Sequence, residues 1–174
     1  GTMTSPSRRF LPYGRQQISD DDIAAVTEVL RGDILTTGPK VAAFEQAIAG
    51  ATGASHAVAC SSGTAALHLA AMALDLGPGD KVVVPALTFL ATANVVRMTG
   101  AEVVFADVDA ETGLMGAWEL SAALTRDGSG QVKAVFSVHY AGQCASPAEL
   151  AAAAKGLPVV ADSCHALGTA YGVG

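Results

Sequence analysis

The chain lacks any apolar segment long enough to cross a bilayer, which excludes a membrane-spanning helix from the expected structure. No apolar stretch follows Arg8 and Arg9, so we expect no secretory signal peptide. Cysteine is scarce as well: Cys60, Cys144 and Cys164 are odd in number and widely spaced, which argues against a disulfide framework or a zinc site. These absences together predict a cytoplasmic protein with no membrane partner.

Positive charge and aromatic side chains are also in short supply. Lys and Arg number 10 against 16 Asp and Glu, and the net charge of −6 at pH 7 argues against nucleic acid as a partner. Aromatic residues make up 5% of the chain, whereas 51% of it is hydrophobic, and alanine and glycine are abundant. With 174 residues, the chain is long enough to bury a substantial core as one closely packed domain.

Apolar runs alternate with helical patterns from residue 56 onward. We predict strands over 56–60, 81–85, 102–108, 132–138 and 157–162, and helices over 63–74, 88–100, 116–124 and 146–155. The strands are continuous apolar runs, which is typical of parallel strands that are covered on both faces. The alternation therefore predicts an α/β fold with three layers and a doubly wound, mostly parallel sheet.

Two further helices are predicted ahead of this alternation. The first follows Ser19 as its N-cap, and the second begins at Pro39. The apolar residues of the second helix, Val41, Phe44 and Ile48, are expected to point inward. We expect residues 1–17 to be an N-terminal arm that begins with residues left from cloning, and residues 18–174 to be the α/β domain.

In open α/β sheets, ligands bind beyond the carboxyl ends of the strands, so the residues after each strand are the candidates for a site. The stretch "SSGTAALH" leads into a helix N-terminus, whose free N–H groups and dipole favour an anion. Gly63 lets a phosphate approach the backbone, and Ser62 and Thr64 add hydroxyl donors. An ordinary capped helix without a ligand explains the same stretch equally well.

Phe89 follows the strand that ends at Pro85. An aromatic side chain at this edge of the sheet can stack on a flat ring, although a phenylalanine in the core is the more common interpretation. A dinucleotide site places Asp or Glu at the end of its second strand, which is 81–85 in this prediction, to bind the ribose. Pro85 therefore argues against such a site.

Asp162 ends an apolar strand, where a carboxylate is costly unless it has a partner. A protonated heterocyclic nitrogen is a suitable partner, because the ionised carboxylate keeps that nitrogen protonated. His139 and Tyr140 follow another strand, where they either line a pocket or have a structural role. Cys164 and His165 are adjacent and point apart, so we expect Cys164 to be a small buried residue and not a nucleophile.

A phosphate, a flat ring and a protonated ring nitrogen together describe pyridoxal phosphate (PLP), which we predict as the cofactor. The chain also resembles the DegT-type (DegT/DnrJ/StrS) sugar aminotransferases, which are fold-type-I PLP enzymes. The motifs that carry the resemblance, in family order, are "LPYGRQQISDDDI", "LTTGPKVAAFE", "SSGTAALHLA", "GDKVVVPALTFLATANVV", "FADVD", "VHYAG" and "VVADSCHALGTAY". "YGRQ", "TFLATAN" and "DSCHALG" are similar to the branch of the pseudaminic acid pathway.

The resemblance implies a role for each matching position. Gly63 and Thr64 would bind the phosphate beside Ser62, Phe89 would stack on the pyridine ring, and Asp162 would pair with the ring nitrogen. His165 would lie beside the phenolic oxygen of the cofactor. The positions implied to face a nucleotide-sugar or a partner subunit are Thr36, Thr37 and His139.

The activity implied is the transfer of an amino group, commonly from glutamate, to a nucleotide-linked 4-keto-6-deoxy sugar by a homodimer. Members of the family continue to a lysine that bonds covalently to PLP, and none of the four lysines here matches it. We therefore expect the N-terminal part of the PLP-binding large domain, inactive by itself. Two alternatives stay open: a noncatalytic binding or regulatory module derived from this fold, and a Rossmann-type enzyme that binds a nucleotide or a methyl donor.

Overall fold

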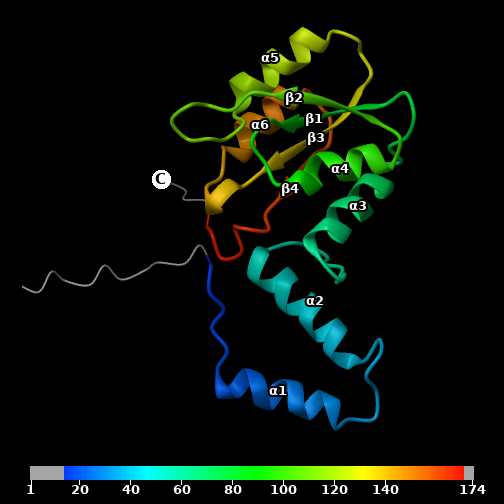
Figure 1. The fold of residues 1–174 in the computed structure, drawn as a ribbon, viewed down its shortest axis with the longest axis vertical. Coiled ribbons are helices and arrows are strands. Elements are labelled where there is room, and N and C mark those ends of the chain that lie inside the picture. Colours follow the sequence, from blue (N-terminus) through cyan, green and yellow to red (C-terminus); the bar gives the residue numbers. More distant parts are fainter. Residues whose placement is uncertain (1–13, 171–174) are drawn as a thin grey trace, which may run out of the picture.

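The computed structural model describes residues 14–170, so most of the predicted arm over residues 1–17 lies outside the described residues. The elements in chain order are α1 (Asp20–Leu30), α2 (Pro39–Thr52), α3 (Gly63–Ala73), β1 (Lys81–Pro85), α4 (Leu90–Met98), β2 (Glu102–Ala106), α5 (Ala117–Asp127), β3 (Val132–Val138), the short 3₁₀ helix η1 (Tyr140–Gly142), α6 (Pro147–Ala154) and β4 (Val159–Asp162) (Figure 1). None of the helices described here combines the length and the hydropathy that crossing a membrane requires.

The strands form one parallel sheet in the order β2-β1-β3-β4. The chain runs outward from β1 to β2 through α4, then returns past β1 to β3 through α5 and on to β4 through α6. The direction of winding therefore reverses between β1 and β3, which is the place where open α/β sheets form their ligand crevices. The predicted three-layer, doubly wound α/β fold is confirmed.

The core lies on both faces of this sheet. Along β1, Val82 and Val84 pack with α3 and α4 on one face, whereas Val83 packs with α5 and α6 on the other. All three valines are fully buried, because successive side chains of a strand point to opposite faces and both faces are covered. Burial on both faces of the sheet thus explains the continuous apolar run of β1, as predicted.

The predicted strand over residues 56–60 is wrong. The described residues form no strand there, and the Val58 side chain is 80% exposed. The Ala59 amide donates to the Glu45 carboxylate over 2.8 Å and not to a neighbouring backbone carbonyl. An extended apolar segment becomes a strand only where another strand lies alongside, and none does so in the described part of the chain.

Helices α1 and α2 lie to one side of the three layers, beyond the end of α3 (Figure 1). Neither helix contains a buried residue. The expectation that Val41, Phe44 and Ile48 point inward is therefore wrong: Val41 and Phe44 are exposed, and Ile48 is half-buried. These three residues have the spacing of an amphipathic helix, but the face that they form packs against no core among the described residues.

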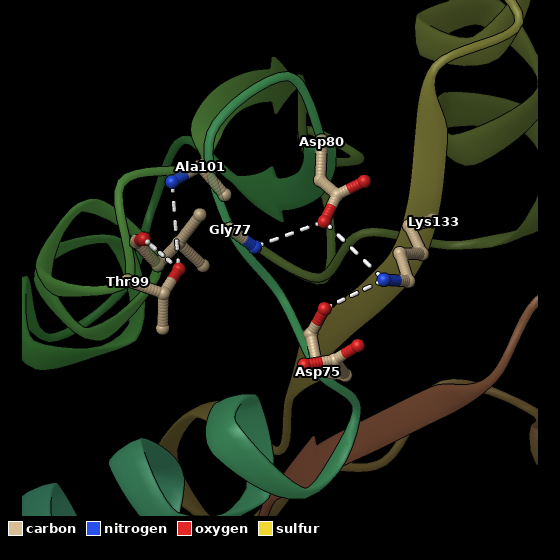
Figure 2. Close-up of polar contacts among 7 residues, drawn as sticks. Asp75, Gly77, Asp80, Thr99, Ala101 and Lys133 are labelled. Carbon is tan, nitrogen blue, oxygen red and sulfur yellow. Dashed lines mark hydrogen bonds and ion pairs between the residues drawn. The ribbon is translucent and has the colours of Figure 1, made fainter.

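Polar side chains hold together the amino-terminal end of the sheet (Figure 2). The Lys133 ammonium donates to the Asp75 carbonyl over 2.6 Å and to the Asp80 carboxylate over 3.3 Å. Asp80 also accepts from the Gly77 amide over 2.9 Å. Lys133 is thereby fixed at the end of the sheet opposite to the carboxyl ends of the strands.

Candidate functional site

A cavity of about 240 Å³ lies beyond the carboxyl ends of β3 and β4. Its wall is made by the start of α3, the start of α4, the segment after β3 and the segment after β4. The lining residues are Gly63, Thr64, Leu67, Phe89, Ala91, Val138, His139, Tyr140, Asp162, Cys164 and His165. The structure therefore brings together residues from four separate sequence motifs at the edge where a ligand was expected.

The first wall of the cavity is the N-terminus of α3. Ser62 is the N-cap, and its hydroxyl oxygen accepts from the Ala65 amide over 3.1 Å. No acceptor among the described residues takes the Gly63 or Thr64 amide proton. These two amides are left for an anion at the positive end of the helix dipole, while Ser62 is occupied as an ordinary cap outside the lining.

Gly63 also leaves no space for a larger residue. A Cβ at this position would collide with the Cys164 Sγ on the opposite wall. Glycine therefore lets the backbone lie directly against the Cys164 thiol, which would have to rotate away to admit a larger residue.

The second wall is Phe89, which is the N-cap of α4. Its side chain is 69% exposed and borders the cavity. The interpretation as a core phenylalanine is therefore wrong: the structure places an exposed aromatic side chain at the cavity. The predicted stacking role stays a prediction.

Asp162 closes the cavity from the end of β4, and its side chain is only 7% exposed. One carboxylate oxygen accepts from the Thr92 hydroxyl over 3.1 Å, and the other accepts from the Cys164 amide over 3.2 Å. No ion pair in the described residues involves Asp162. A buried carboxylate that neutral donors hold at a cavity wall is suited to a cationic ligand group.

Two histidines and a tyrosine complete the lining. His139 Nδ1 lies 3.0 Å from the Ser163 hydroxyl, and the Tyr140 and His165 rings meet edge to face with centroids 6.3 Å apart. Burial lowers the pKa of His139, although the nearby Asp162 charge opposes this. His139 therefore faces the cavity as a neutral imidazole at pH 7, in the same site as Asp162.

Cys164 is an exposed residue, so the expectation that it is a small buried residue is wrong, although its thiol is partly covered at the cavity wall. A hydrogen bond with the Asp162 carboxylate, together with burial and the charge of that carboxylate, raises the pKa of Cys164 to about 11. The thiol is then protonated throughout the neutral range, which argues against a nucleophilic role.

This pKa predicts the alkylation behaviour of Cys164. With Cys60→Ser and Cys144→Ser leaving it as the sole cysteine, its reaction with iodoacetamide should be slow at pH 8. The rate should then rise about tenfold per pH unit, because the thiolate fraction does so below the pKa. Adding Asp162→Asn should speed the reaction at pH 8. A rate in the parent variant that levels off near pH 9 would contradict the assignment.

Thr36 and Thr37 do not reach the cavity. They lie in the loop between α1 and α2, where Thr37 has a left-handed backbone with φ of 52°. The structure does not join them to the other candidate residues, and their predicted contact with a nucleotide-sugar or a partner subunit stays a prediction.

Sequence reasoning missed Thr92, which is fully buried and binds Asp162. A signal for it exists in the sequence. Thr92 shares one face of its helix with Val95 and Val96, at the spacing of core residues. A hydroxyl on an otherwise apolar face requires a buried partner.

The chain is similar to known proteins over most of its length. Residues 16–173 match the DegT/DnrJ/EryC1/StrS aminotransferase family, and the chain belongs to this family. The resemblance of the motifs to DegT-type enzymes is thus confirmed, whereas membership of the pseudaminic acid branch is not shown.

Three solved structures illustrate the likeness. DesV of S. venezuelae is 32% identical with a TM-score of 0.79 over 84% of this chain, and an aminotransferase from Psychrobacter cryohalolentis is 32% identical with a TM-score of 0.84 over 92%. Spr1654 from Streptococcus pneumoniae, described as a putative sugar aminotransferase in its PMP form, is 31% identical with a TM-score of 0.83 over 91%. The chain spans 39% to 43% of the length of these proteins. Spr1654 has also been solved in a PLP form.

Proposed function

We propose that this chain forms the PLP-binding part of an aminotransferase that moves an amino group, with glutamate as donor, to a nucleotide-linked 4-keto-6-deoxy sugar. The observation that carries the proposal is Asp162, a buried carboxylate without a cationic partner on the described chain that faces a cavity. The description of Spr1654 as a putative sugar aminotransferase supports a sugar as the acceptor of the amino group.

The cavity fits the chemical groups of PLP. The free Gly63 and Thr64 amides suit its phosphate, Phe89 suits the face of its ring, and Asp162 suits its ring nitrogen. When bound, PLP acts as the electron sink for amino transfer. The protein supports this chemistry because the Asp162 carboxylate holds a proton on the ring nitrogen, while His165 and the neutral His139 line the same cavity.

None of the four lysines lines the cavity. Lys40 lies at the start of α2 and Lys155 caps the end of α6. Lys81 and Lys133 bind carboxylates at the amino-terminal end of the sheet, with Lys81 2.7 Å from Asp127. We therefore propose that this chain by itself binds PLP without a covalent bond and does not catalyse transfer.

Titration of the chain with PLP by calorimetry tests this function. We expect saturable binding of PLP and weaker binding of pyridoxal, which is the matched control because it lacks the phosphate. NAD and S-adenosylmethionine should not bind, since the turn between β1 and α4, residues 86–89, contains no glycine to let a pyrophosphate approach the backbone. After borohydride reduction, mass spectrometry should find no stable adduct on a single lysine. Binding of NAD or the methyl donor in place of PLP would favour the Rossmann-type alternative.

The finer assignments rest on the motifs. We propose the pseudaminic acid branch as the source of the keto sugar, a cytoplasmic location, and a homodimer in which Thr36 and Thr37 face the substrate or the second copy. A 33% identical relative is 3-amino-5-hydroxybenzoic acid synthase, which represents a different product class. Amino transfer by the whole protein, assayed with keto sugars and with a keto precursor of that acid, distinguishes the two classes.

A further inference from the structure

We propose that Thr92 is a positioning residue for Asp162: its hydroxyl fixes the carboxylate in the orientation that receives the protonated ring nitrogen of PLP, an inference that rests on the proposed function. The direct observation is the 3.1 Å hydrogen bond from the Thr92 Oγ1 to the Asp162 Oδ2. Both groups are buried, and 70 residues of sequence separate them.

The direction of this hydrogen bond follows from the chemistry of its two partners. An ionised carboxylate only accepts, so the single hydroxyl proton of Thr92 must point to Asp162. The Thr88 Oγ1 lies 2.8 Å from the Thr92 Oγ1, and Thr88 must then be the donor in that pair. The result is a directed relay in which each hydroxyl polarises the next toward the carboxylate.

Other helical threonines of this chain behave differently. The hydroxyls of Thr27, Thr52 and Thr125 each donate over 2.8 Å to the carbonyl four residues earlier in their own helix. That local bond satisfies a threonine hydroxyl without any tertiary partner. The Thr92 hydroxyl instead donates its proton to Asp162 at the end of β4, and not to a carbonyl of its own helix.

The place of Thr92 in α4 links two walls of the cavity. Phe89 is the N-cap of this helix, and its carbonyl accepts from the Thr92 amide over 3.1 Å. The same helical turn therefore sets the position of the exposed ring at the cavity and of the hydroxyl that holds Asp162. Any shift of α4 would move both groups together.

The other carboxylate oxygen has its own donor. The Cys164 amide binds the Asp162 Oδ1 over 3.2 Å, so the carboxylate is held at both oxygens. Each carboxylate oxygen can accept a second hydrogen bond, and lone pairs therefore stay available to the ligand. Without the Thr92 hydroxyl, only Cys164, in the segment after β4, would orient the group from the protein side.

The test compares Thr92→Val, which keeps the branched shape but loses the hydroxyl, with Thr92→Ser, which keeps the hydroxyl. The affinity for PLP is measured by calorimetry, and the protonation of the ring nitrogen is read from the ¹⁵N chemical shift of ring-labelled PLP bound to the full chain. We expect Thr92→Val to weaken binding about three- to tenfold and to move the ¹⁵N signal toward the unprotonated value. Thr92→Ser should restore both.

Thr88→Val serves as the second variant, since Thr88 is only half-buried and its loss leaves the Thr92 hydroxyl in place. We expect a smaller change in the same direction, and this variant decides the matter if Thr92→Val does not fold. A merely structural Thr92 would lower the urea midpoint but leave the ¹⁵N signal and the affinity unchanged, which would overturn the inference alone. Failure of the unmodified chain to bind PLP would overturn the proposed function as well.

Discussion

Replacing Asp162 with asparagine is expected to weaken PLP binding roughly 10- to 100-fold, since hydrogen bonds to charged groups contribute about 1.5–3 kcal/mol. Asparagine keeps the shape of the side chain but removes the charge that favours a protonated ring nitrogen. The buried position of Asp162 leaves little water to screen that charge. Calorimetric titration of both forms with PLP measures the loss.

Asp75→Asn is the matched control for this substitution. Asp75 is exposed at the opposite end of the sheet, and its left-handed backbone, with φ of 52°, suits asparagine. Its affinity for PLP should equal that of the unmodified chain. If Asp162→Asn bound PLP as tightly as Asp75→Asn, the pairing of Asp162 with the ring nitrogen would be wrong.

Replacing Phe136 with alanine is expected to lower the free energy of unfolding by about 3–5 kcal/mol. Phe136 lies on the inner strand β3, is the largest fully buried side chain of the described residues, and packs with α3 and α4. Its removal loses the transfer free energy of the ring and leaves a cavity that rigid neighbours fill only in part. Urea denaturation followed by circular dichroism measures the change.

Phe105 provides the comparison on a strand of the same sheet. It lies on the edge strand β2 and is 52% exposed, so Phe105→Ala should cost about 1 kcal/mol or less. Equal losses for the two variants would mean that the side of β3 facing α3 and α4 is not the core that the structure describes.

The sequence predicts the sheet well where both faces of a strand are covered. The apolar run Val82 to Val84 predicts a buried strand from the local sequence alone, because helices on both faces of the sheet bury all three side chains. The run over residues 56–60 has the same apolar character but lacks an adjacent strand, and pairing is a property of the tertiary fold that a local pattern does not contain. The same limit explains the exposed apolar faces of α1 and α2.

The residues of the candidate site, too, can be predicted from the sequence only in part. Asp162 and Phe89 can be found from the sequence because Asp162 ends an apolar strand and Phe89 comes shortly after one, and parallel strands bring their carboxyl ends to one edge. Thr92 cannot be assigned a partner in this way, since its hydroxyl could equally have bonded its own helix, as that of Thr27 does. Which partner a buried hydroxyl takes depends on the tertiary fold, which brings Thr92 of α4 to Asp162 at the end of β4.

The placement of charge around the sheet gives the cavity a polarity. The Lys81 and Lys133 ammonium groups are held by carboxylates at the far end, so no lysine neutralises Asp162. At the cavity, the amides at the start of α3 present partial positive charge, and Asp162 presents negative charge on another wall. A ligand with an anionic tail and a cationic ring is attracted in one orientation, and in the reverse orientation its phosphate would meet the carboxylate. The cavity thus selects the direction in which such a ligand enters, before any bond to it is formed.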